Sequence, residues 1–279
     1  MTTTRKAVIL ARGLGSRMRR ADAEATLDAA QAQAADAGLK AMIPIGRPFL
    51  DYVISALADA GITDVCLVIG PEHDSIRAHY ATGLTRVRVH FAVQAEPRGT
   101  ADAVAAAETF AGADTFLVLN ADNYYPVDAY RRLAALGGAG LVGFDADALV
   151  RQGNIPAERV RAFALVTVTM DTGGDAAHGG SQLASIVEKP DADTYTRLAP
   201  HALVSMNLWS FTPTIFAACR RVTPSVRREL ELQDAVRFAR DELREQFTVI
   251  PFAGGVLDLS HRSDIPAVAA ALDGVAVRL

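Results

Sequence analysis

Short apolar runs alternate with helical patterns through the first half of this 279-residue chain. The apolar runs predict strands at 7–10, 65–69, 87–93 and 116–119, and the segments between them predict helices at 50–60, 74–80, 101–110 and 127–136. Gly61 is placed to end the first of these helices, and Thr100 to cap the third. Apolar strands that alternate with helices indicate a mainly parallel sheet covered on both faces, in which ligands bind beyond the carboxyl ends of the strands.

The second half of the chain has a different pattern. Strands are predicted at 162–170, 183–187 and 203–211 without intervening helices, and the polar stretch 171–180 is typical of a hairpin loop. Helices at 213–221 and 232–245 and strands at 248–252 and 256–259 follow. We therefore expect a single α/β domain over residues 1–279. Its Rossmann-like, GT-A-type sheet is mixed but mainly parallel and flanked by helices, and it carries an antiparallel extension in the second half.

One segment, 20–37, is a low-complexity run of Ala, Asp, Glu and Gln. These residues favour a helix, but they give it little apolar face with which to pack against a core. We expect a solvated or mobile helix here.

Composition narrows the class of protein. Half of the residues are hydrophobic, which is enough for a large core, and the net charge of −4 argues against a nucleic-acid partner. No apolar stretch has the length of a membrane span, and the apolar run near the start is too short for a signal peptide. Cys66 lies in an apolar run and reads as a buried strand thiol, and Cys219 forms no metal or redox motif with it. We expect a cytoplasmic protein with no membrane partner.

The loop after the first strand carries the first candidate chemistry. Gly13 and Gly15 allow backbone N–H groups to approach an anion, a following helix would add its dipole, and Arg17 offers donors for phosphate oxygens. Met18 takes the third glycine position of a dinucleotide-binding loop, and no Gly-Lys-Ser/Thr of a P-loop follows. The six histidines form no ligand cluster, and there is no serine nucleophile elbow. The loop by itself indicates an anion site.

Five motifs place this loop in a wider context. They are 11–19 (ARGLGSRMR) with 40–49 (KAMIPIGRPF), 94–103 (QAEPRGTADA), 119–123 (LNADN), 187–190 (VEKP) and 255–258 (GVLD). In this order they resemble the sugar-1-phosphate nucleotidyltransferase family, which includes glucose-1-phosphate uridylyl- and thymidylyltransferases and ADP-glucose pyrophosphorylase. The resemblance implies an enzyme that joins a nucleoside triphosphate (NTP) to a sugar 1-phosphate, with release of pyrophosphate. Residues 1–145 would form its nucleotide-binding half, and 146–279 its sugar-phosphate-binding half.

The resemblance also implies a role for each matched residue. Asp122 and Asp258 would bind Mg²⁺, which needs only one or two protein carboxylates beside phosphate oxygens and water. Arg17, Lys40 and Lys189 would be catalytic, because they neutralise or align the phosphates. The nucleotide would contact Leu10, Ala11, Gly13, Leu14, Gly15, Ser16, Gln94, Gly99 and Thr100. The sugar phosphate would contact Asn120, Ala164, Glu188, Lys189 and Asn207, with support from Glu229 or Glu231 and Asp234.

No catalytic base is expected, because the second pKa of a phosphate monoester is about 6 and the acceptor is already ionised at neutral pH. An acceptor phosphate oxygen would attack the α-phosphorus directly and in line, so that the rate depends on alignment and charge neutralisation.

Three positions depart from the family pattern. Arg12 stands where a small residue is usual, and it either adds a phosphate contact or crowds the nucleotide. The 20–37 segment lengthens the distance between Arg17 and Lys40, and we expect it to act as a lid over the nucleotide. Phe163-Ala164 replaces a usual Tyr-Gly pair, which leaves a sugar-like cyclitol phosphate open as the acceptor.

Two other functions are weighed against this one. A non-catalytic sugar-nucleotide sensor on the same fold is favoured by Arg12, but it would not need to keep Arg17, Asp122, Lys189 and Asp258 together. A glycosyltransferase would need a D-x-D motif after the fourth strand, where Asn123 follows Asp122, and the D-x-D at 145–147 lacks the rest of that context. The sequence leaves open the nucleobase, the sugar, and whether the protein is a monomer or a homodimer.

Overall fold

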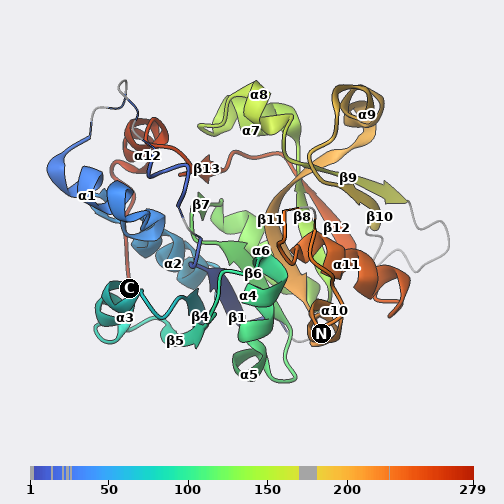
Figure 1. Ribbon diagram of the computed structural model, residues 1–279, viewed down its shortest axis with the longest axis horizontal. Helices are drawn as coiled ribbons and strands as arrows, with labels where there is room; N and C mark the ends of the chain where they lie inside the picture. Colours follow the sequence, from blue (N-terminus) through green and yellow to red (C-terminus); the bar gives the residue numbers. More distant parts are fainter. Residues whose placement is uncertain are drawn as a thin grey trace.

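The computed structural model describes residues 3–13, 15–20, 22, 25, 27–169, 181–225 and 227–279. A nine-stranded mixed sheet runs through the molecule in the order β5-β4-β1-β6-β11-β8-β12-β10-β9 (Figure 1). Its parallel half consists of β5 (Arg88–Val93), β4 (Asp64–Ile69), β1 (Lys6–Leu10) and β6 (Phe116–Asn120).

The other half of the sheet contains the antiparallel extension. Its strands are β11 (Leu203–Phe211), β8 (Gly140–Phe144), β12 (Thr248–Phe252), β10 (Ser181–Val187) and β9 (Ala164–Thr169). β11 is antiparallel to β6, β8 and β9, whereas β8 and β12 are parallel to each other. Two small ladders lie apart from the main sheet, β2 (Pro44–Ile45) with β3 (Arg47–Pro48) and β7 (Asn123–Tyr124) with β13 (Leu257–Asp258). The expected α/β class with an antiparallel extension is confirmed.

Helices cover both faces of the sheet and enclose two hydrophobic cores. The first core receives side chains from α2 (Phe49–Asp59), α3 (Asp74–Tyr80), α6 (Val127–Leu136) and α12 (Asp264–Leu272). The second receives them from α4 (Thr100–Ala106), α5 (Glu108–Ala111), α10 (Thr214–Cys219) and α11 (Leu232–Asp241). The strands have apolar side chains on both faces because each face is covered, which is what their uniformly apolar runs predict.

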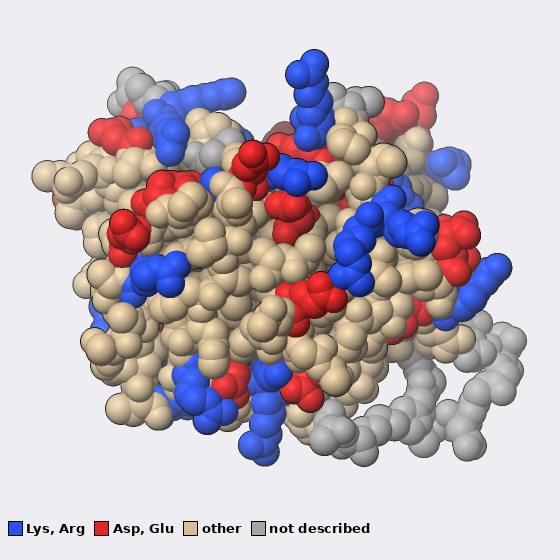
Figure 2. Space-filling view, turned by 60° about the horizontal axis from the view of Figure 1, so that its bottom comes forward, with Lys and Arg blue, Asp and Glu red and all other residues tan. Residues whose placement is uncertain are grey.

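The remaining helices lie near the carboxyl ends of the central strands or at the margins. They are α1 (Ala29–Ala37), α7 (Ala146–Gln152), α8 (Ala157–Val160), α9 (Ala192–Leu198) and the 3₁₀ turns η1 (Lys40–Met42) and η2 (Ala199–His201). None of the helices in the described ranges is long and apolar enough to cross a membrane. On the face shown in Figure 2, acidic and basic side chains are interspersed and do not separate into large patches of one sign.

Several sequence predictions need correction. Gly61 does follow the end of α2 in a left-handed conformation, but the N-cap of α4 is Gly99 and not Thr100. The Thr100 hydroxyl instead accepts a hydrogen bond from the Leu232 backbone N–H at 2.9 Å, which ties α4 to α11. The single helix predicted at 101–110 is divided at Ala107 into α4 and α5. The hairpin loop predicted at 171–180 lies outside the described residues.

Strand β8 and helices α7, α8 and α9 were not predicted from the sequence. β8 has glycine at two of its five positions, and glycine is depleted in strands, so its strand signal is weak. A Cβ at Gly140 would lie 2.4 Å from the carbonyl oxygen of Thr248, and one at Gly143 would lie 2.7 Å from a Leu203 methyl group. Both glycines therefore serve close packing within the sheet, which only the tertiary structure reveals.

The described part of the 20–37 segment forms α1. Asp28 and Gln31 form a capping box at its start, and Gln31 also donates to the Pro44 carbonyl oxygen at 3.1 Å. Ala35 is the buried residue of this helix, and Asp36 pairs with Arg262. The expectation of a largely solvated helix is confirmed for 29–37, and its role as a lid stays a prediction.

Both cysteines are free and buried, which yields a prediction about their reactivity. Burial raises the pKa of the Cys66 thiol, and likewise that of Cys219, to about 12. Because the thiolate is the reactive form, a raised pKa leaves little of it at pH 8. We expect no reaction of the native protein with a disulfide reagent such as DTNB within minutes, and two thiols per chain after denaturation in guanidinium. Rapid native reaction would contradict the burial of both thiols.

Candidate active site

A cavity of about 750 Å³ opens at the carboxyl ends of β1 and β6, where a parallel sheet is expected to bind ligands. Its lining includes every described residue to which the resemblance assigns a catalytic, metal-binding or substrate contact: Leu10, Ala11, Gly13, Gly15, Ser16, Arg17, Lys40, Gln94, Gly99, Thr100, Asn120, Asp122, Ala164, Glu188, Lys189, Asn207 and Asp258. Leu14 lies outside the described residues. Of the supporting carboxylates, Glu229 and Glu231 line the cavity, whereas Asp234 is not in the lining and pairs with Arg237.

The glycine loop is held by packing at Gly15. This residue has φ of 61°, and a Cβ there would lie 2.4 Å from the Gly38 carbonyl oxygen. At Gly13, apart from its chain neighbours, the described residues have no heavy atom within 4 Å of the same position. The expected helix after the loop is wrong, because residues 16–19 form a turn that closes from the Arg19 N–H to the Gly15 carbonyl oxygen at 2.9 Å. The loop therefore offers backbone donors without a helix dipole behind them.

The two glycines of this loop give a matched pair of variants. Gly15→Ala places a side chain on a residue in the left-handed backbone conformation, which costs about 1–2 kcal/mol of stability. The added methyl group would also clash with the backbone of Gly38. We expect this variant to lower the melting temperature and to weaken nucleotide binding at least about tenfold, since about 1.4 kcal/mol corresponds to tenfold in affinity. The Gly13→Ala methyl group meets none of the described residues beyond its chain neighbours, so this variant should leave the melting temperature unchanged. Calorimetry of the two variants checks this, and equal melting temperatures would contradict it.

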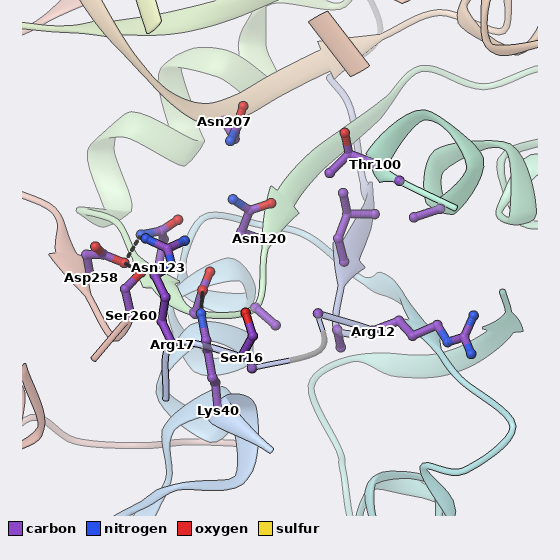
Figure 3. A pocket seen from close by; sticks show the side chains of 18 of the residues that line it. Arg12, Ser16, Arg17, Lys40, Thr100, Asn120, Asn123, Asn207, Asp258 and Ser260 are labelled. Atoms are coloured by element: carbon purple, nitrogen blue, oxygen red, sulfur yellow. Dashed lines mark hydrogen bonds and ion pairs between the residues drawn. The ribbon is translucent and has the colours of Figure 1, made fainter. Parts of the chain in front are cut away.

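Asp122 and Asp258 line one part of the cavity, which we call the acidic corner. Figure 3 labels Asp258 and Lys40 in this corner. Lys40 Nζ donates to Asp122 Oδ2 at 2.8 Å, so Lys40 reaches the site in spite of the long segment before it. Asp258 is 4% exposed and accepts hydrogen bonds from Ser260 Oγ at 2.8 Å and Asn123 Nδ2 at 3.3 Å. Burial, and then the charge of Asp122, raise the pKa of Asp258 to about 6. A divalent cation between these carboxylates would relieve both effects.

The donor set of this corner fits magnesium better than zinc. No group of three or more His, Cys, Asp and Glu side chains in the described ranges could hold a metal ion. Two carboxylates beside a phosphate-binding loop are what Mg²⁺ uses, because it keeps water and substrate oxygens as its other ligands.

Arg159 is a cation of this corner that sequence analysis missed. Its Nη1 donates to Asp264 at 3.0 Å and lies 2.9 Å from His261 Nδ1, and its Nη2 lies 3.5 Å from Asp258 Oδ2. Nε and Nη2 are buried and have no hydrogen-bond partner among the described residues. Arg159 comes from the short helix α8, which carries no motif, so no signal in the sequence indicates it.

The acceptor side of the cavity is shaped by two unusual backbone positions. Lys189 and Asn207 have φ of 43° and 58°, in the left-handed region that non-glycine residues seldom adopt. Gln233 Nε2 donates to Asn207 Oδ1 at 3.0 Å, which leaves the Asn207 amide nitrogen as a donor toward the cavity. Burial, and then the charge of Glu231, raise the pKa of Glu188 above its usual value. Strain and a perturbed carboxyl together are typical of a binding site.

Arg12 extends away from the acidic corner. Figure 3 shows it on the opposite side of the cavity from Asp258, whereas Arg17 and Lys40 extend on the side of Asp258. Its Nε and Nη2 each lie 3.4 Å from a carboxylate oxygen of Glu72, and its Nη1 is buried without a partner among the described residues. Arg12 thus adds no cation to the corner where Arg17 and Lys40 gather.

The fold and the cavity define an α/β protein whose candidate ligand site lies at the carboxyl ends of its parallel strands. The chain belongs to the nucleotidyl transferase family, whose model matches residues 6–253. This confirms the enzyme class inferred from the five motifs.

Curated relatives and solved structures agree with this assignment. UTP–glucose-1-phosphate uridylyltransferase 1 of Streptococcus pyogenes serotype M1 is 26% identical over 260 residues, which cover 85% of this chain and 78% of the relative. A crystal structure of UDP-glucose pyrophosphorylase complexed with UDP-glucose has a TM-score of 0.72 at 18% identity, over 97% of this chain and 98% of the other. UTP-bound UGPase from Acinetobacter baumannii has a TM-score of 0.72 at 20% identity, over 98% and 95%. The two structures show that the fold is shared over nearly the full length of the alignment with this chain.

Proposed function

We propose that this enzyme transfers a uridylyl group from UTP to a sugar 1-phosphate of the glucose 1-phosphate class, to give a UDP-sugar and pyrophosphate. The observation that carries the proposal is the acidic corner, in which Lys40, Asp122 and Asp258 line the same cavity as the glycine loop and the Glu188-Lys189 segment. The names of the relatives support the choice of UTP and of the glucose 1-phosphate class.

In the proposed reaction a phosphate oxygen of the acceptor attacks the α-phosphorus of UTP, and pyrophosphate leaves from the opposite side. Asp122 and Asp258 would hold Mg²⁺, which withdraws charge from the phosphate oxygens that it touches. Arg17 and Lys40 neutralise the leaving pyrophosphate, and Lys189 holds the attacking phosphate in line. Glu188 and Asn207 bind the sugar hydroxyls, as acceptor and donor respectively.

In this proposal the two halves of the chain bind different substrates. Residues 1–145 contribute the glycine loop, Lys40 and Asp122 to the nucleotide side, and residues 146–279 contribute Glu188, Lys189 and Asn207 to the acceptor side. Asp258, from the second half, is placed on the same ladder as Asn123 by β13, and so joins the two sides.

Release of pyrophosphate tests the proposal directly. The full-length protein is assayed with Mg²⁺ against five triphosphates (UTP, dTTP, ATP, GTP, CTP) and a panel of sugar and cyclitol 1-phosphates. We expect the highest kcat/KM with UTP and a glucose 1-phosphate-type acceptor. Turnover confined to another base or to a cyclitol phosphate would correct the substrate assignment. No turnover in any combination would favour a non-catalytic sensor.

A further inference from the structure

Arg262, which comes just before α12, contacts two segments that follow the first strand of the chain. Its side chain is 11% exposed. Nε donates to the Met18 carbonyl oxygen at 2.8 Å, and Nη2 lies 3.5 Å from the Arg19 carbonyl oxygen and pairs with Asp36 of α1. Nε and Nη2 form one edge of the planar guanidinium. A single rigid group therefore contacts both the 16–19 turn and the end of α1.

The segment that carries Arg262 is fixed to the acidic corner. The Asp258 N–H donates to Asn154 Oδ1 at 2.7 Å, and Asn154 Nδ2 donates to the Asp258 carbonyl oxygen at 2.9 Å. The Leu259 N–H donates to the Asp122 carbonyl oxygen at 2.9 Å. Because hydrogen bonds are directional, these three set the position of the backbone relative to both carboxylates of the corner. Arg262 follows a few residues later, so it starts from a backbone in a defined place.

The 16–19 turn carries Arg17, and packing alone does not fix the orientation of the turn. The Met18 side chain is fully buried, but methionine is unbranched and has three rotatable bonds, so its burial still lets the backbone rotate. The bond from the Arg19 N–H to the Gly15 carbonyl oxygen closes the turn, but it links the turn only to its own loop. A directional bond from outside the loop to the Met18 carbonyl oxygen limits this rotation. Arg17 directly precedes the peptide that is held in this way.

We propose that Arg262 is a positioning residue for Arg17: it sets the turn that bears Arg17 in place relative to the segment that bears Asp258. This inference rests on the proposed function, in which Arg17 neutralises the leaving pyrophosphate and Asp258 helps to hold Mg²⁺. Both groups act on one chain of phosphates, so they must be placed relative to each other and not only within their own elements. Arg262 makes this connection through the protein and is not part of the cavity lining.

The test compares pyrophosphate release by the full-length wild-type protein and by Arg262→Met, which keeps a long apolar side chain but removes the donors. A shift of a catalytic group on the order of 1 Å can lower the rate about a hundredfold. We expect kcat to fall roughly tenfold to a hundredfold, and the inhibition constant of added pyrophosphate to rise at least about threefold. The KM for the sugar 1-phosphate should stay within about twofold of wild type. A general loosening of the fold would instead weaken the binding of both substrates.

The double variant Arg17→Met/Arg262→Met decides whether Arg262 acts through Arg17. Once the Arg17 guanidinium is absent, loss of Arg262 has no catalytic cation left to misplace. We therefore expect the kcat of the double variant to lie within about threefold of that of Arg17→Met alone. Independent roles would multiply the two losses, and that result would overturn the inference.

Two further variants serve as controls. Asp36→Asn weakens the pairing of Arg262 with α1 but leaves the bond to the Met18 carbonyl oxygen in place, so kcat should stay within about threefold of wild type. Arg132→Met removes another arginine that donates to a backbone carbonyl oxygen, that of Pro251 at 3.1 Å, and that does not line the cavity. It should leave all three constants unchanged. If Asp36→Asn reproduced the loss seen in Arg262→Met, the effect would pass through α1 and the inference would be wrong.

The outcomes separate the inference from the function on which it rests. If Arg262→Met melts below the assay temperature, Arg262→Gln is held to the same expectations. A folded variant with the wild-type kcat and pyrophosphate inhibition constant would overturn the inference and leave the uridylyltransferase intact. An Arg17→Met protein with wild-type kcat would also overturn it, because there would be no catalytic arginine to position. Absence of wild-type turnover with every triphosphate and sugar 1-phosphate would instead refute the proposed function.

Discussion

Asp122→Asn is expected to lower kcat by about 10²–10³-fold, because it removes one of the two carboxylates of the acidic corner. The substitution keeps the shape of the side chain, but it halves the negative charge that would hold Mg²⁺. It also removes the anionic partner of Lys40, which lies 2.8 Å away in this structure. The measurement is kcat for pyrophosphate release at saturating substrates, together with the Mg²⁺ concentration that gives half-maximal rate. We expect that concentration to rise.

The fold should survive this change, since Asp122 lies at the edge of the cavity and is 21% exposed. Calorimetry should give a melting temperature close to that of the wild type. Asp147→Asn is the matched control, because Asp147 is 84% exposed and its partner Arg151 is 3.8 Å away. If Asp122→Asn retained a rate within threefold of the control, the metal-binding role of Asp122 would be refuted.

Much of the fold follows from local patterns that survive into the structure. The parallel strands are apolar throughout because both faces of the sheet are covered, so β1, β4 and β6 stand out in the sequence. β8 does not stand out, because Gly140 and Gly143 meet the strands beside them, and those contacts arise between residues that lie far apart in the sequence. Sequence patterns report what a residue does within its own element. They do not report which other element lies against it.

The site likewise contains residues that the sequence indicated and residues that only the structure shows. The family resemblance indicated motif residues such as Asp122 and Lys189, and both line the cavity. The resemblance also brought in Asp258, from the end of the chain. Arg159 could not be found, because helix α8 carries no motif and Arg159 meets the distant Asp258 only in the folded structure. The sequence also does not show which way the Gln94 side-chain amide is turned, because that orientation is set by hydrogen bonds to Asp102 and Gly99.

Arg17→Met is expected to lower kcat by about 10²–10³-fold and to raise the KM for the triphosphate, since it removes one of the cations aimed at the departing phosphates. Arg17 stands on the 16–19 turn, which is anchored by the fully buried Met18 side chain and by a hydrogen bond from Arg262 Nε to the Met18 carbonyl oxygen at 2.8 Å. In Figure 3, Arg17 extends toward the same side of the cavity as Asp258 and Asn123. Among the described residues its guanidinium makes no hydrogen bond or ion pair, so these donors are available to a phosphate.

Two companion variants decide whether the guanidinium itself is responsible. Arg17→Lys keeps the positive charge but loses the two parallel N–H donors of the guanidinium. We therefore expect its kcat to lie between those of Arg17→Met and the wild type. Arg19→Met changes the other arginine of the same turn, which does not line the cavity and donates instead to the Ala37 carbonyl oxygen. It should leave kcat nearly unchanged. Equal losses of activity in Arg17→Met and Arg19→Met would show that the turn's structure, and not the Arg17 guanidinium, accounts for the effect.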